Sequence, residues 1–163
     1  MFHLRWLRTS LVLLALGCGG GTPVTLTPTV PPVPNLVAEL RPKDTPSASP
    51  LRAIVRATDA ETQVGLMYRK EPLKDDEGML FIFPDDIDHR FWMENTYLSL
   101  DMVFIDSAGT VVGVLDHVPP LTRDSRHVGV PSRYVLEIGA GNAARLGYRV
   151  GTPLAITLTA HSG

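Results

Sequence analysis

Short apolar stretches follow one another from about residue 51 onward, and glycine, proline or acidic residues end each of them. The stretches are rich in β-branched and aromatic residues, which is the pattern of β-strands separated by turns. No regular alternation of strands with long helices accompanies them. The pattern predicts strands over residues 51–57, 79–83, 89–95, 100–105, 110–115, 134–138 and 153–158.

Two short helices are expected between these strands. Thr58 and Glu61 have the spacing of a capping box, in which a hydroxyl and a carboxylate satisfy free N–H groups at a helix start. Asn142 can cap a second helix that Gly147 ends. The predicted fold class is therefore α+β, mainly antiparallel β, with a barrel-like or curved sheet and two short helices.

The first residues have the pattern of an export signal. Arg5 and Arg8 precede an apolar run over residues 11–16, which is far shorter than the ~20 residues of a membrane-spanning helix. Ala15-Leu16-Gly17-Cys18 resembles the lipobox of bacterial lipoproteins, in which the cysteine is lipidated. We expect a signal peptide over residues 1–17 and a lipid anchor at Cys18. The alternative is an ordinary secretory signal with a chance cysteine nearby.

Residues 18–50 form a separate segment by composition. Eight of the 14 prolines of the chain lie there, and proline removes the N–H donors that helices and sheets require. An extended tether is therefore predicted, in which residues 35–40 are the one stretch able to pair as an edge strand. The domain itself is predicted over residues 51–163, in the cell envelope and on the periplasmic face of the outer membrane if the host has two membranes.

Charge and cysteine content exclude a nucleic-acid-binding function and an intramolecular disulfide. The net charge is −2 and no basic run is present, so the chain lacks the electrostatic footprint of a nucleic-acid binder. A single cysteine excludes an intramolecular disulfide. The expected partners are instead the membrane, through Cys18, and an envelope glycan or protein.

Five strings resemble, in the same order, the successive blocks of the DUF192 family, and the resemblance runs from about residue 57 to residue 159. Glu94 stands where the family usually has lysine, and Val64 where a polar or basic residue is common. The resemblance implies a small, mostly β domain, often exported, and it implies no activity. The strings are Gly65-Leu66-Met67-Tyr68-Arg69, Gly78-Met79-Leu80-Phe81-Ile82-Phe83, Phe91-Trp92-Met93-Glu94-Asn95-Thr96, Leu100-Asp101-Met102-Val103-Phe104-Ile105-Asp106 and Val135-Leu136-Glu137.

The tryptophan block supplies the candidate ligand site. Tryptophan together with amide and carboxyl groups suits stacking on, and hydrogen bonding to, a sugar or a peptide. In the alternative interpretation Trp92 is a core residue, the residues after it form a turn, and Asp101 caps that turn. The candidate ligand-binding residues are Trp92, Asn95, Thr96, Asp101 and Glu137.

No metal, cofactor or catalytic residue is predicted. Met67, Met79, Met93 and Met102 carry thioethers that suit Cu(I), but their spacing favours a role as core filler. Asp85, Asp86 and Asp88 lack the spacing of a calcium loop and indicate a solvated turn.

These observations predict a non-enzymatic, membrane-tethered binding or accessory module of the cell envelope. Two alternatives stay open. A cell-envelope glycan hydrolase would use Asp101 and Glu137, provided that the two carboxyl groups lie about 5–10 Å apart across a cleft. A copper-binding protein would use the clustered methionines.

Overall fold

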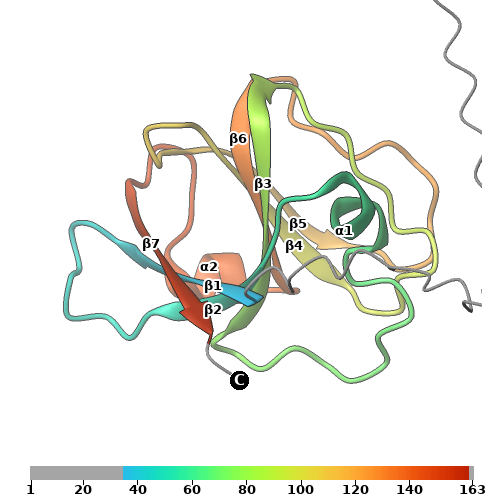
Figure 1. Ribbon diagram of the computed structural model, residues 1–163, viewed down its shortest axis with the longest axis horizontal. Helices are drawn as coiled ribbons and strands as arrows, with labels where there is room; N and C mark the ends of the chain where they lie inside the picture. Colours follow the sequence, from blue (N-terminus) through green and yellow to red (C-terminus); the bar gives the residue numbers. More distant parts are fainter. Residues whose placement is uncertain (1–34, 162–163) are drawn as a thin grey trace, which may run out of the picture. The chain divides into compact units, whose positions relative to one another are not determined.

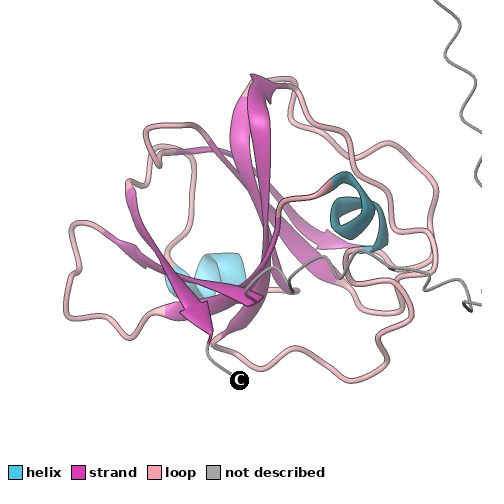
Figure 2. Cartoon of the chain, in the orientation of Figure 1, coloured by secondary structure: helices cyan, strands magenta, loops and turns pink. Residues whose placement is uncertain are grey.

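Seven strands form a single sheet in the order β5-β4-β6-β3-β2-β1-β7 in the computed structural model, which describes residues 35–161 (Figure 1). All neighbouring strands are antiparallel except β2 and β3, which are parallel. The mainly antiparallel α+β fold with two short helices is thus confirmed (Figure 2). The elements are β1 Asn35–Pro42, β2 Leu51–Arg56, α1 Asp59–Val64, β3 Glu77–Ile87, β4 Leu100–Ile105, β5 Val111–Val118, β6 Ser132–Gly139, α2 Asn142–Leu146 and β7 Leu154–His161.

The sheet is curved but not closed. Its edge strands β5 and β7 approach each other at one end, where Thr110 and Pro153 form an isolated bridge. The predicted signal peptide, Cys18 and the first part of the predicted tether lie outside the described residues. Within residues 35–161, no helix is both long and apolar enough to cross a membrane.

Each face of the sheet carries its own apolar core, because successive side chains of a strand point to opposite faces. The first core includes Leu80, Leu136 and Ile138 of the central strands and is covered by α2, which contributes Ala143. The second core lies on the other face, under the segment after α1 and the long loops. Its buried residues are Leu66, Met79, Phe81, Met93, Leu100, Met102, Phe104, Val118 and Val135.

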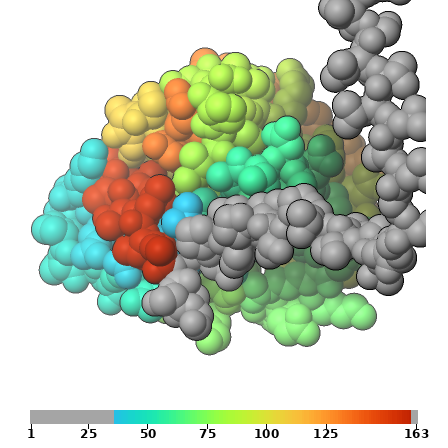
Figure 3. Space-filling view, viewed as in Figure 1, coloured from blue at the N-terminus to red at the C-terminus, as the bar shows by residue number. Residues whose placement is uncertain are grey.

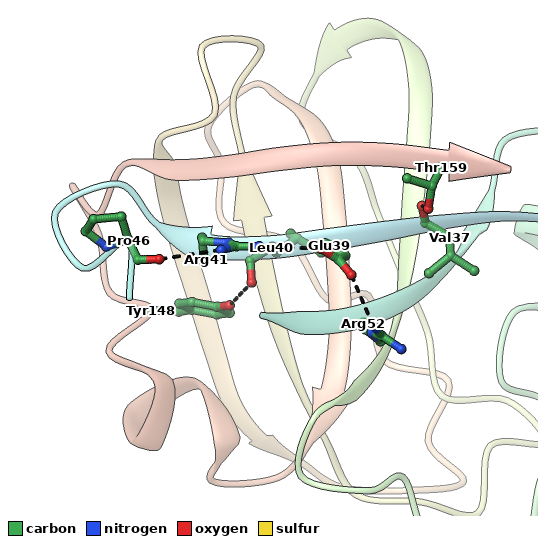
Figure 4. A network of polar contacts seen from close by, with 8 residues as sticks. All are labelled: Val37, Glu39, Leu40, Arg41, Pro46, Arg52, Tyr148 and Thr159. Carbon is green, nitrogen blue, oxygen red and sulfur yellow. Dashed lines mark hydrogen bonds and ion pairs between the residues drawn. The ribbon is translucent and has the colours of Figure 1, made fainter. Parts of the chain in front are cut away.

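β1 is an internal strand of the sheet, whereas the sequence predicted a domain that starts near Leu51. It pairs with β2 on one side and with β7 on the other, and Ala38 and Leu40 are fully buried. The hydroxyl of Tyr148 donates to the carbonyl of Leu40 over 3.2 Å, and Arg52 pairs with Glu39 at 3.3 Å (Figure 4). In the space-filling view the C-terminal strand lies against the chain around β1 (Figure 3).

The prediction that residues 35–40 can pair as a strand is confirmed, although β1 is an internal strand and not an edge strand. Proline placement explains how a strand fits into this proline-rich segment. Pro42 is the last residue of β1, where the missing N–H costs little, and Pro46 and Pro50 lie in the turn that follows. The prolines of this segment therefore lie before and after residues 35–41, and residues 35–41 themselves contain none. The folded unit begins at β1, and only residues before it remain as the predicted tether.

The predicted strand over residues 89–95 is wrong. This segment is a loop that meets the loop over residues 119–131, with one isolated bridge between Phe91 and Arg126. Asn95 has a φ of 54°, a left-handed conformation that a strand does not allow and that asparagine adopts more readily than most residues. Apolar and polar residues alternate here because the loop covers a core, and not because it pairs in the sheet.

Candidate functional site

A cavity of about 170 Å³ lies on the face of the sheet that carries the second core. Its floor comes from β3 and β6, and its walls come from α1 with the residues after it and from the loop that contains Trp92. Trp92 is 50% exposed. The lining residues are Thr62, Gln63, Val64, Gly65, Leu66, Met67, Phe81, Phe83, Arg90, Phe91, Trp92, Thr96 and Glu137.

The sheet register places Glu137 in the floor. Its Cα lies opposite Met79 on β3 and opposite Met102 on β4, so both flanking neighbours are apolar. Val135, two residues earlier on β6, belongs to the second core, and the same alternation directs Glu137 to that face. A carboxyl group therefore lies in the cavity floor between methionine residues of the two flanking strands.

Glu137 is buried without a polar partner. The residue is 5% exposed, and its carboxyl group makes no hydrogen bond or ion pair with residues 35–161. Its oxygens are not among the fully enclosed side-chain atoms without a partner, which in the described part of the chain are Nε of Arg126 and Oγ of Ser132, so they remain accessible from the cavity. Burial raises the pKa of Glu137 to about 8, because an apolar environment disfavours the charged form. At neutral pH the carboxyl group therefore holds its proton in the absence of a ligand.

Helix α1 and the turn after it form one wall, and local sequence fixes both. The predicted capping box is confirmed: the N–H of Glu61 donates to Oγ1 of Thr58, and the N–H of Thr58 donates to the Glu61 carboxylate. The latter bond holds the pKa of Glu61 below its ordinary value. The helix ends at Gly65, whose φ of 47° suits glycine and whose missing side chain leaves room for the ring of Phe81.

Backbone hydrogen bonds hold the opposite wall in place. The N–H of Met93 donates to the carbonyl of Thr122 over 2.9 Å, and Phe91 and Arg126 exchange bonds of 2.9 and 2.8 Å. The N–H of Tyr68 donates to the carbonyl of Asn95 over 2.8 Å, which ties this loop to the segment after α1. Backbone hydrogen bonds of Phe91 and Met93, the residues on either side, thus hold Trp92 in position.

Three of the five predicted site residues meet at this cavity, namely Trp92, Thr96 and Glu137. Asn95 is adjacent but has another role, since its amide donates to the hydroxyl of Tyr68 over 3.1 Å. Glu94, the residue that differs from the family pattern, accepts a 2.6 Å bond from Arg123. The charge of Glu94 is therefore matched by a cation from the neighbouring loop.

Asp101 lies on the opposite face of the sheet from Glu137. It is fully buried, and its two oxygens accept the N–H groups of His117 and Ala143, both at 2.9 Å. The second bond satisfies a free donor in the first turn of α2, so Asp101 caps that helix from a neighbouring strand. The prediction that Asp101 and Glu137 line one groove is wrong, and the carboxyl pair that a glycan hydrolase needs is not assembled.

Most of the methionines pack in the core, and the neighbouring aspartates form hydrogen bonds and ion pairs. Met79, Met93 and Met102 belong to the second core, whereas Met67 lines the cavity. The predicted turn is wrong for Asp85 and Asp86, which are exposed residues near the end of β3, whereas Asp88 follows the strand. Asp86 accepts a 2.8 Å bond from Arg133, and Asp88 pairs with His127 at 2.8 Å. In the part of the chain that the structure describes, no group of three or more His, Cys, Asp or Glu residues is placed to hold a metal ion.

Several lining residues were not predicted from the sequence. Phe81 and Phe83 are two apart on a strand and so share a face, a signal that the continuous apolar run over residues 79–83 obscured. Arg90 and Phe91 lie within residues 89–95, for which the sequence predicts a strand and the structure has a loop. The wall over residues 62–67 carries no polar motif that could have marked it.

Comparison with known proteins identifies a family and similar solved structures. The model of the DUF192 family, described as "Uncharacterized ACR", matches residues 41–156, which confirms the resemblance. No curated protein matches the chain. A crystal structure of a protein of unknown function from Novosphingobium aromaticivorans is 30% identical, with a TM-score of 0.64, and the match covers 73% of this chain and 83% of that one. A proposed transcription regulator from Sinorhizobium meliloti is 33% identical, with a TM-score of 0.64 and coverage of 76% and 95%.

Proposed function

We propose, from the premise that the chain belongs to the DUF192 family, that it is a non-enzymatic, membrane-tethered binding module of the cell envelope whose ligand enters the cavity beside Trp92. The observation that carries this proposal is the buried carboxyl group of Glu137, which lines the cavity and has no polar partner among the described residues. Its oxygens are accessible from the cavity, where a ligand can reach them. A ligand that supplies the missing partner accounts for this group.

The energetic cost of Glu137 supports a functional role. Burial disfavours the charged form of this carboxyl group, and a leucine at the same position would avoid that cost. Apolar sites with a few placed polar groups are the usual form of small-ligand pockets. Their polar groups give orientation and specificity, which is the role we assign to Glu137 and Thr96.

The size of the cavity limits what it can hold. Its volume of about 170 Å³ is close to that of an engineered cavity of about 150 Å³ that binds benzene. Val64 and Trp92 are exposed at the cavity, and Tyr68 and Leu121 are exposed on the segments bonded to its rim. We therefore assign the cavity to one end of a larger glycan or peptide, whose remainder lies on this apolar rim.

The envelope location rests on the segment before the sheet. A signal-like stretch, Cys18 and a proline-rich stretch precede β1, an order that suits a lipid-anchored tether. A net charge of −2 without a basic run gives no support for a nucleic-acid partner.

Trp92 provides a direct test of binding. The chain has two tryptophans, at positions 6 and 92, so a protein of residues 33–163 reports on Trp92 alone. We expect a muropeptide, glycan or short peptide to change its fluorescence in a saturable way. The same ligand at about 100 times its dissociation constant should add about 2.7 kcal/mol to the free energy of unfolding.

A matched pair of variants locates the site. Trp92→Ala should abolish the stabilisation by ligand, whereas Val150→Ala, a change at another exposed apolar residue, should leave it intact. If no ligand of these three classes alters either the fluorescence or the thermal stability, the proposed function is wrong.

A further inference from the structure

The cavity beside Trp92 combines one buried carboxyl group with several aromatic side chains. Phe81, Phe83, Phe91 and Trp92 all line it, and Glu137 lies in its floor. The rings of Phe81 and Phe91 meet edge to face, with centroids 5.2 Å apart and planes at 77°, so the two rings differ in orientation around the space. The faces of aromatic rings carry partial negative charge and attract cations.

The carboxyl group of Glu137, when ionised, attracts a cation as the ring faces do. An opposite charge within about 4–6 Å favours the ionised form of a carboxyl group, and an N–H donor would satisfy oxygens that have no partner among the described residues. A neutral hydroxyl would satisfy the carboxyl group but would gain little from the ring faces. The two features together therefore select for positive charge.

Other charged groups around the cavity leave this preference in place. Among residues 35–161, Arg90 is the one other charged side chain that lines it, and its guanidinium lies 3.6 Å from Asp88 and 3.4 Å from Ser125. His89 stacks on Phe83, with ring centroids 3.7 Å apart. The other side chains near Glu137 have no titratable group. They come from α1 and the residues after it, from β3 and β4, and from the loop that carries Trp92. They include Thr62, Gln63, Met67, Met79, Thr96 and Met102.

We infer that this cavity binds an alkylammonium group, whose charge lies against Glu137 and whose carbon chain packs among the rings of Phe81, Phe91 and Trp92. The inference rests on the proposed function and names the chemical class of the ligand end that enters the cavity. A volume of about 170 Å³ accommodates a short alkylammonium chain, such as the end of a lysine side chain.

Ammonium binding has a defined dependence on pH. Because burial raises the pKa of Glu137 to about 8, the carboxyl group must release its proton before it can pair with a cation at lower pH. The association constant for an alkylammonium ion should therefore rise by about tenfold per pH unit up to that value, and level off above it. A neutral ligand that accepts a hydrogen bond from the protonated carboxyl group would show the opposite trend.

The test is a titration of Trp92 fluorescence in residues 33–163 with n-butylammonium chloride, with 1-butanol and with sodium butyrate, at constant ionic strength from pH 6 to pH 9. We expect butylammonium to bind more tightly than butanol at pH 9 and to show the predicted rise with pH. Glu137→Gln should weaken butylammonium binding by about tenfold or more. Glu94→Gln removes the same charge outside the cavity and should change binding by less than about twofold.

The outcomes separate this inference from the proposed function. Equal binding of butylammonium and butanol at pH 9, or unchanged butylammonium binding by Glu137→Gln, overturns the ammonium inference and leaves a binding cavity in place. Tighter binding of butyrate has the same meaning. If the three probes and the glycan and peptide ligands all fail to perturb Trp92, both the inference and the proposed function are wrong.

Discussion

Asp101 and Glu137 are both buried carboxyl groups, and their surroundings give them different roles. The two oxygens of Asp101 each accept a backbone N–H, so this side chain fixes the residues around His117 and the start of α2. Glu137 has no such partner within the described residues and faces a cavity instead. The sequence could not distinguish the two, because the difference depends on which face of the sheet each residue occupies.

The pH dependence of folding should reveal Glu137. Its pKa of about 8 in the folded state lies above the ordinary value of 4.5, so between these values the folded state holds a proton that the unfolded state has lost. The contribution of Glu137 to the free energy of unfolding is thus fully present below pH 4.5. It is lost as pH rises through this window, at a rate of up to about 1.4 kcal/mol per pH unit.

Glu137→Gln should remove this loss, since a buried amide does not ionise. We expect the melting temperature of the variant to exceed that of the wild type by on the order of 10 °C at pH 9 and to match it closely at pH 5. Urea unfolding at a series of pH values measures the difference, with Glu94→Gln as the control that should follow the wild type. Parallel curves for wild type and Glu137→Gln would mean that the carboxyl group has an ordinary pKa.

At the scale of elements, the sequence predicted well wherever a local interaction decides the structure. The capping box of α1 and the antiparallel pair β4 and β5 depend on residues close together in the chain. The errors concern the start of the domain, the edge position given to residues 35–40, and the strand predicted over residues 89–95, and all three depend on distant partners. β1 is a strand because β2 and β7 lie on both sides of it, and residues 89–95 form a loop because the residues after Pro119 pair with them.

The candidate site follows the same rule. The tryptophan block contributes Trp92 and Thr96 to the cavity lining, and an aromatic residue among polar ones is visible in a single segment. The rest of the cavity comes from α1, β3 and β6, which converge only through the register of the sheet. No local sequence pattern predicts that register.

The position of β1 leads to a truncation test. A protein of residues 51–163 lacks this strand, so β2 and β7 lose the backbone ladder that joins them, and the first core loses Ala38 and Leu40. We expect it to show no cooperative thermal unfolding by circular dichroism, whereas residues 33–163 should unfold cooperatively. A shared melting temperature for the two proteins would show that β1 contributes nothing to stability.

At the scale of the whole molecule, the tether hypothesis concerns residues outside the described part of the chain. It predicts that the protein expressed in a bacterial host fractionates with membranes and incorporates a labelled fatty acid. Cys18→Ser should abolish the labelling, because lipidation requires the thiol, and without two acyl chains stable anchoring is lost. Ser10→Ala, a small change in the same leading segment, should leave both results unchanged. Labelling that persists in Cys18→Ser would refute the anchor.

The parallel pairing of β2 and β3 has a consequence for how this domain can diversify. Parallel neighbours require a connection that runs from one end of the sheet to the other, and here residues 57–76 make that crossing. The same residues include the wall of the cavity over 62–67. Because the entropy of closing a loop grows slowly with its length, insertions in this crossing cost little stability. Ligand preference can thus change through one tolerant segment, while the hydrogen bonds of the sheet stay as they are.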